Sequence, residues 1–120
     1  MAKNQSNPAI NERLFTSQVK ALAKTLGYRT YHTFFSIKSE KGWPDLAIYK
    51  PGILIFAELK TNKGRLTPSQ IETLYALYEA GQIVFVWRPD QYQQIAHILQ
   101  CRPDEIRTYY QQTVTNEEFY

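Results

Sequence analysis

The chain of 120 residues contains one cysteine, Cys101, and two histidines. A single cysteine excludes an intrachain disulfide, and the residues around it lack the Cys and His spacing of a zinc site. No window approaches the ~20 apolar residues that a membrane-spanning helix needs, and the N-terminus has no apolar region typical of a signal peptide. We therefore expect a soluble protein in a reducing, cytoplasmic compartment.

The composition is that of one globular domain. Hydrophobic residues make up 43% of the chain and charged residues 21%, which is enough for a modest core at this length. The net charge of +3 and a sequence pI near 9.0 favour a polyanionic partner such as nucleic acid, although many soluble proteins are as basic. The chain contains no internal repeat and no low-complexity segment.

Apolar residues at helical spacing predict a first helix that follows Asn7 as cap and Pro8 as first residue and ends at Gly27. A second helix follows Thr67, because Gln70 stands where it would close a capping box. It ends before the glycine at position 81. A third helix is predicted from residue 90, with aspartate as its cap, to about residue 100.

Strand-forming residues occupy four segments. Residues 29–36 are aromatic and β-branched, and "PDLAIY" and "ILIFAELK" flank a turn centred on Pro51 and Gly52. The apolar segment "QIVFVW" is typical of a buried strand, which we expect to enter the sheet by a crossover from the second helix. Residues 101–120 are polar and rich in tyrosine, and the pattern leaves open a polar C-terminal tail or one more edge element.

The hairpin places two acids opposite each other. If Pro51 and Gly52 form the turn, Lys50 faces Ile53 and the same register sets Asp45 against Glu58. Opposed residues have Cβ atoms ~5 Å apart on one face, where like charges are destabilising. Lys60 lies two residues beyond Glu58, so it shares that face. A three-residue loop or a bulge would shift the register by one and separate the acids.

A third acid lies on the first helix. Glu12 precedes Phe15 by three residues and Val19 by seven, so it continues the apolar stripe and is expected to point towards the sheet. The alternative is that Glu12 stabilises the helix dipole in the first turn and has no chemical role.

Converging carboxylates are ligands that Mg²⁺ prefers, together with water and substrate phosphate. A lysine beside them can orient a water molecule or stabilise charge on phosphate. The combined pattern predicts metal-assisted hydrolysis of a phosphodiester.

"PDLAIY" followed by "AELK" resembles the PD-(D/E)xK signature of the restriction-endonuclease-like nucleases, carried by Pro44, Asp45, Glu58 and Lys60. The wider frame, "NERLFTSQVKALAKTLGYRTYHT", "KGWPDLAIY", "ILIFAELKTNKGRLTPSQ" and "AGQIVFVWRP", is similar in order and spacing to the VRR-NUC family of that superfamily. The resemblance covers roughly residues 10 to 100. It implies an α/β, restriction-endonuclease-like core at about residues 8–100, with a mixed central sheet flanked by helices.

The resemblance also implies chemistry. Family members use Mg²⁺ or Mn²⁺ and leave a 5′-phosphate, and stand-alone members, often phage-encoded, resemble Holliday-junction resolvases that cut branched DNA as homodimers. By this resemblance Asp45 and Glu58 are metal carboxylates and Lys60 is the catalytic lysine. The resemblance also implies the Leu59 carbonyl as a backbone ligand of the metal and Glu12 as the helix-borne acid. Gln70 matches the glutamine that opens the helix after the signature, although the capping box alone would explain a glutamine at this position.

Four basic residues flank the acidic face and are candidate phosphate contacts, or simply solvated charges. They are Lys38, Lys41, Lys63 and Arg65. No base-reading motif appears, so recognition by nucleic-acid shape is favoured. His32 alternates with aromatics and is interpreted as a packed histidine, and Trp43, before a proline, as a lid over the core.

Other functions stay open. A flap or single-strand nuclease of the same family would use the same residues, and a catalytically silent nucleic-acid-binding module would keep only the fold. The presence of Asp45, Glu58 and Lys60 together favours the enzyme.

Overall fold

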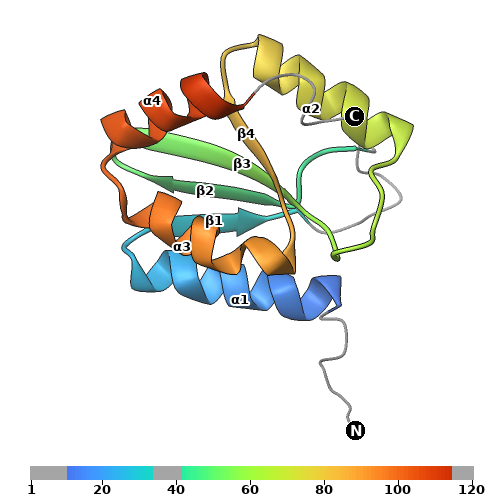
Figure 1. Ribbon diagram of the computed structural model, residues 1–120, viewed down its shortest axis with the longest axis horizontal. Helices are drawn as coiled ribbons and strands as arrows, with labels where there is room; N and C mark the ends of the chain where they lie inside the picture. The colour runs from blue at the N-terminus through green and yellow to red at the C-terminus, as the bar shows by residue number, and fades with distance from the viewer. Residues whose placement is uncertain (1–10, 34–41, 115–120) are drawn as a thin grey trace, which may run out of the picture.

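The computed structural model describes residues 11–33 and 42–114. They contain a four-stranded sheet in the order β1-β2-β3-β4 (Figure 1). β1, β2 and β3 pair antiparallel, and β4 pairs parallel to β3 after a crossover through a helix. The mixed sheet flanked by helices confirms the predicted α/β class. The strands are β1 (Arg29–His32), β2 (Leu46–Lys50), β3 (Ile53–Leu59) and β4 (Ile83–Trp87).

Helices cover both faces of the sheet, with α1 and α3 on one side and α2 on the other (Figure 1). The larger core lies on the side of α1 and α3 and includes Phe15, Ile55 and Ile95. A smaller apolar cluster lies under α2, around Leu74 and Val84. The helices are α1 (Glu12–Thr25), α2 (Pro68–Glu79), α3 (Tyr92–Gln100) and α4 (Pro103–Thr113).

The β2–β3 hairpin has the predicted register. Lys50 pairs with Ile53 across a two-residue turn of Pro51 and Gly52, and Leu46 pairs with Ala57. Gly52 has a φ of 95°, which the second central residue of such a turn requires and which glycine adopts at little cost. Because the register is unbroken, Asp45, just before β2, is set against Glu58 near the end of β3.

Burial alternates along β3 and assigns its two faces. Ile53, Ile55, Ala57 and Leu59 are buried in the larger core. Glu58 therefore points to the opposite face, where α2 lies, and Lys60 follows on the same side. The acidic face of the hairpin is thus covered by α2 rather than by α1.

Three predicted helix or strand ends were wrong. Helix α1 begins at Glu12 because Asn11 caps it, its Oδ1 accepting the N–H of Leu14 at 2.8 Å; the predicted cap and first residue, Asn7 and Pro8, lie outside the described residues. β1 ends at His32, and residues 34–36 of the expected strand also lie outside them. Asp90 does not cap α3, because it lies within a 3-10 turn, η1 (Pro89–Gln91).

The prediction of a polar tail or edge element was also wrong for residues 103–113. This segment forms α4, which places Ile106 and Tyr110 in the larger core. The Tyr110 ring contacts Phe85 of β4 edge to face, with centroids 5.4 Å apart. Residues 115–120 lie outside the described residues. Among the helices of 11–33 and 42–114, none has the length and apolar character needed to span a membrane.

Candidate active site

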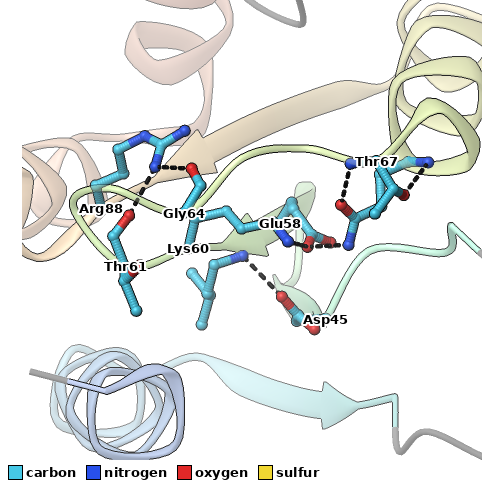
Figure 2. Close-up of polar contacts among 9 residues, drawn as sticks. Asp45, Glu58, Lys60, Thr61, Gly64, Thr67 and Arg88 are labelled. Atoms are coloured by element: carbon cyan, nitrogen blue, oxygen red, sulfur yellow. Dashed lines mark hydrogen bonds and ion pairs between the residues drawn. The ribbon is translucent and has the colours of Figure 1, made fainter.

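Asp45 and Glu58 form the centre of the candidate site. Asp45 Oδ2 accepts the backbone N–H of Leu59 at 2.8 Å, so its carboxylate is tied to the end of β3 beside Glu58 (Figure 2). This bond extends the hairpin contact one residue beyond the last strand pair, Leu46 with Ala57. The two acids lie together as the register predicted.

Glu58 is almost completely buried, with 1% of its surface exposed. Its Oε2 accepts a hydrogen bond of 2.9 Å from Nε2 of Gln70 and lies 3.9 Å from Nζ of Lys60. Its Oε1 is buried and has no hydrogen-bond partner among the described residues. A buried carboxylate oxygen without a partner is costly, so this atom is suited to bind a cation or to carry a proton.

Burial, more than any other cause, raises the pKa of Glu58 from 4.5 to about 8. The negative charge of Asp45 raises this pKa further, whereas the ammonium of Lys60 lowers it. Without a cation, Glu58 is therefore largely protonated near neutral pH and can share its proton with Asp45. A divalent cation bound between the two acids would offset both the burial and the repulsion that raise this pKa.

Lys60 is held at the same face, 8% exposed. Its backbone N–H donates to the carbonyl of Trp87 at 3.0 Å, so the β3–β4 pairing continues one residue past the end of β3. This pairing fixes the start of the Lys60 side chain. Its ammonium is buried beside Glu58 rather than solvated.

Gln70 links the site to the start of α2. Its Oε1 accepts the N–H of Thr67 at 2.8 Å and its backbone N–H donates to Thr67 Oγ1 at 3.2 Å, which forms the predicted capping box. Its Nε2 simultaneously donates to Glu58 (Figure 2). Gln70 therefore forms the predicted capping box and also contacts Glu58, while its catalytic role stays a prediction.

The loop of residues 61–66 joins Lys60 to α2 and is held by Arg88. Nη1 of Arg88 donates to the carbonyls of Thr61 and Gly64 at 2.6 Å each (Figure 2). Arg88 was not among the predicted site residues, because its only sequence signal is its place directly after a buried strand. Lys63 and Arg65 are exposed on this loop, as predicted. Lys38 and Lys41 lie outside the described residues.

Glu12 does not join the two acids in a three-acid cluster. It is exposed in the first turn of α1, and no group of three or more His, Cys, Asp or Glu side chains converges within residues 11–33 and 42–114. Its charge still acts on Glu58, whose pKa it raises slightly. Glu12 therefore lies in the surroundings of the site, and its first-turn position also agrees with stabilisation of the helix dipole.

The segment that leads into Asp45 packs closely against the start of α2. Gly42 has a φ of 92°, and a Cβ on it would lie 2.3 Å from the carbonyl oxygen of Ser69. Trp43 is 45% exposed and meets the ring of Phe56 edge to face, with centroids 5.8 Å apart. Trp43 thus packs on Phe56 at the margin of the smaller apolar cluster, with nearly half of its surface exposed, and its interpretation as a lid over the core stays a prediction.

The donor set fits a hard divalent cation. Asp45 and Glu58 supply carboxylate oxygens, and within residues 11–33 and 42–114 Glu58 Oε1 has no hydrogen-bond partner. Mg²⁺ is commonly bound by one or two protein carboxylates, with water and phosphate completing its coordination. The residues present therefore suit Mg²⁺ or Mn²⁺ in a site that substrate completes.

The sequence matches no protein-family model and no curated protein. A solved structure described as a VRR_NUC domain protein does match, with a TM-score of 0.57 and 18% sequence identity over 88% of each chain. This similarity covers most of the chain and confirms the fold class implied by the sequence motifs. The chain thus has the fold of a VRR-NUC domain protein.

Proposed function

We propose that this protein is a metal-dependent DNA endonuclease. The observation that carries the proposal is the carboxyl pair of Asp45 and Glu58. In the described part of the chain Glu58 Oε1 has no hydrogen-bond partner, whereas Lys60 and Gln70 both contact Oε2. A structural ion pair would satisfy its buried oxygens, whereas a site for cation and phosphate leaves one available. The shared fold and the PD-(D/E)xK residues support the same function.

Asp45 and Glu58 would hold the Mg²⁺ or Mn²⁺ ion, with the Leu59 carbonyl as a further candidate ligand. When bound, the ion supplies Lewis-acid polarisation of the scissile phosphate. Asp45 is held ready for this role, because its Oδ2 is fixed by the Leu59 N–H. Gln70 orients Glu58 through Oε2 and leaves Oε1 available.

Lys60 would supply the positive charge that stabilises the reacting phosphate. Its ammonium lies 3.9 Å from Glu58 Oε2 on the face that would receive the phosphate. From this position it can donate a hydrogen bond to a nonbridging phosphate oxygen, or orient the attacking water, and stabilise charge that grows in the transition state. Hydrolysis would leave a 5′-phosphate on the product.

The preferred substrate is proposed to be branched DNA of the Holliday-junction type. The chain is basic overall, with a net charge of +3, and the sequence contains no base-reading motif. Shape recognition by phosphate contacts fits both features. Symmetric cutting of a junction needs two active sites, so this proposal includes a homodimer.

Cleavage of labelled four-way-junction, flap, single-stranded and duplex DNA should be compared with Mg²⁺, with Mn²⁺ and with EDTA. We expect cutting only with metal, and paired nicks in opposed strands of the junction. Preferential cutting of the flap or single strand would replace the resolvase by the other nuclease. No cutting of any substrate would argue for a binding module.

Asp45→Ala and Glu58→Ala should each abolish cleavage and leave DNA binding largely intact. Unchanged cleavage by both variants would overturn the site assignment. Sedimentation should show a dimer at working concentration, and a monomer that still nicks the junction symmetrically would contradict the homodimer. Glu72→Gln, an exposed acid on α2, is the control for loss of one negative charge.

A further inference from the structure

A cavity of about 490 Å³ lies beside the acidic pair, on the same face of the sheet. Val86, which lines this cavity, is the β4 partner of Glu58. Arg88, which also lines it, directly follows Trp87, and the carbonyl of Trp87 accepts the N–H of Lys60. Because neighbouring strands lie ~4.8 Å apart, the cavity is next to the candidate active site. Its lining includes Gly64, Arg65 and Leu66 of the loop, Val86, Arg88 and Gln91.

Arg88 brings an uncompensated positive charge to this cavity. Nη1 donates to two neutral carbonyls, those of Thr61 and Gly64, and within the described residues Arg88 forms no ion pair with an acid. Nε and Nη2 make no hydrogen bond to the described part of the chain. The remaining N–H groups of this half-buried guanidinium are therefore available to an anion in the cavity.

The other polar groups of the cavity agree with this reading. Arg65 adds a second guanidinium and also has no acidic partner among the described residues. Gln91 Oε1 accepts the backbone N–H of Arg88 at 2.8 Å, so this side chain is held at the edge of the cavity. Two guanidinium groups can form charge-assisted, bidentate hydrogen bonds with phosphate oxygens.

We propose that this cavity binds a phosphate of the DNA strand that neighbours the scissile phosphate. The inference rests on the proposed nuclease function for the identity of the anion, but not for the anion site itself. Arg88 has two tasks: Nη1 holds the loop of residues 61–64, and its remaining N–H groups contact the phosphate. Figure 2 draws Lys60 between Arg88 and Glu58. The proposed phosphate contact at Arg88 and the acidic pair would therefore lie on either side of Lys60.

The loop is preorganised for this contact. Asp90 N–H donates to Asn62 Oδ1 at 3.1 Å, and Gly64 N–H donates to the Thr61 carbonyl at 3.2 Å. These bonds, with the two from Arg88, fix the backbone before DNA arrives. Fixing a second phosphate would set the position of the strand, and therefore of the reacting phosphate, over Asp45 and Glu58.

The direct test is a titration with inorganic phosphate in EDTA, followed by NMR of the arginine Nε–H signals. We expect the signals of Arg88 and Arg65 to shift in a saturable way, while that of Arg29 does not. Arg29 lies at the far end of the sheet, opposite Tyr49, and serves as the matched arginine. Shifts that are equal at all three arginines, or absent at Arg88 and Arg65, would overturn the anion site.

Gln91→Glu is the discriminating variant. Glutamate keeps an acceptor for the Arg88 N–H, so the loop contacts should survive, but it brings a negative charge to the cavity. We expect Gln91→Glu to abolish the phosphate-dependent shifts and leave the thermal unfolding midpoint within a few degrees of that of the wild type. A folded Gln91→Glu protein with unchanged phosphate shifts would contradict the proposal.

DNA binding in EDTA distinguishes a strand phosphate from free phosphate. Arg65→Ala should raise the Kd for a duplex or junction about tenfold and reduce the slope of log K against log salt by about 0.9. Arg29→Ala should change neither quantity. The contrary outcome is saturable binding of inorganic phosphate, together with DNA binding by Arg65→Ala that keeps the salt dependence of the wild type. That pair of results would overturn the DNA-strand assignment and show a site for free phosphate.

The outcomes separate the anion site from the nuclease. Metal-dependent cleavage with no anion binding at Arg88 would disprove the cavity proposal and support the enzyme. Phosphate and DNA binding through Arg65 and Arg88, without cleavage on any substrate, would support the cavity and disprove the nuclease.

Discussion

Nε2 of Gln70 donates a hydrogen bond of 2.9 Å to Oε2 of Glu58, while the opposite end of the same amide closes the capping box with Thr67. The amide therefore connects the start of α2 to the buried acid on β3. Because the donor is anchored to a helix end, Glu58 is oriented by a rigid element rather than by a loop. Glu58 Oε1 has no hydrogen-bond partner among the residues that the structure describes.

Gln70→Met should reduce metal-dependent cleavage about 10- to 100-fold, because Glu58 loses the donor that orients it. The hydrogen bond from Gln70 favours the ionised carboxylate of Glu58 and so lowers the pKa of Glu58. Loss of this bond should therefore also shift the acid limb of the pH–rate profile to higher pH. Thr67→Val is the control, since it breaks the cap but keeps the Gln70 amide. It should cost about 1 kcal/mol of stability and leave the profile in place. Equal pH profiles for the two variants would show that Gln70 is only a cap.

The metal-free protein should lose stability as pH rises from about 4.5 to 8. Folded Glu58 has its pKa raised to about 8 from 4.5, so over this range the folded state keeps a proton that the unfolded state has lost. The contribution is fully present below pH 4.5 and is lost by the time pH exceeds 8, a fall in the free energy of unfolding on the order of 5 kcal/mol. Denaturant unfolding in EDTA across this range would measure it.

Glu58→Gln should flatten this pH dependence and be more stable than the wild type at pH 8. Glu72→Gln, which removes an exposed acid, should retain the wild-type dependence. A flat profile for the wild-type protein would show that Glu58 ionises near its ordinary pKa, and the buried acid pair would then need another explanation.

Mg²⁺ should raise the thermal unfolding midpoint, and more strongly at pH 8 than at pH 6. A ligand that binds only the folded state stabilises it, by about 2.7 kcal/mol at 100 times its Kd. Binding at Glu58 must displace its proton, so the metal affinity increases with pH. Asp45→Asn should remove most of the effect while its amide oxygen still accepts the Leu59 N–H. A Mg²⁺ shift that Na⁺ of equal ionic strength reproduces would contradict specific binding.

Gly42→Ala should be clearly more destabilising than Gly27→Ala. Both glycines have a φ near 90°, but a Cβ on Gly42 would meet the Ser69 carbonyl and Thr73 Oγ1, whereas nothing lies within 4 Å of one on Gly27. Gly27→Ala should cost about 1–2 kcal/mol for its backbone alone, and Gly42→Ala a further 1–3 kcal/mol for the clash. Denaturant unfolding would measure both costs. Equal losses would mean that the segment before Asp45 is not packed against α2.

The parts of the fold that could be predicted are those with local causes. The Pro51–Gly52 turn sets the hairpin register, and the Thr67 and Gln70 pair sets the start of α2. The errors lie where local signals compete. Asn11 and Asn7 are both acceptable caps, and the structure selects the one nearer to the buried Phe15. In α4, Ile106 and Tyr110 are four residues apart, a helical signal that the surrounding polar residues obscured.

The sequence by itself determined that Asp45 faces Glu58 and that Lys60 shares their side, because strand alternation and a two-residue turn need only a count along the chain. Only the tertiary structure decided that Glu58 is buried, that its pKa rises and that Arg88 holds the loop after Lys60. Glu58 is desolvated because α2 and β4 cover it, and Arg88 reaches carbonyls 24 and 27 residues earlier in the chain. Both depend on the crossover that returns the chain beside β3, an arrangement that no local pattern encodes.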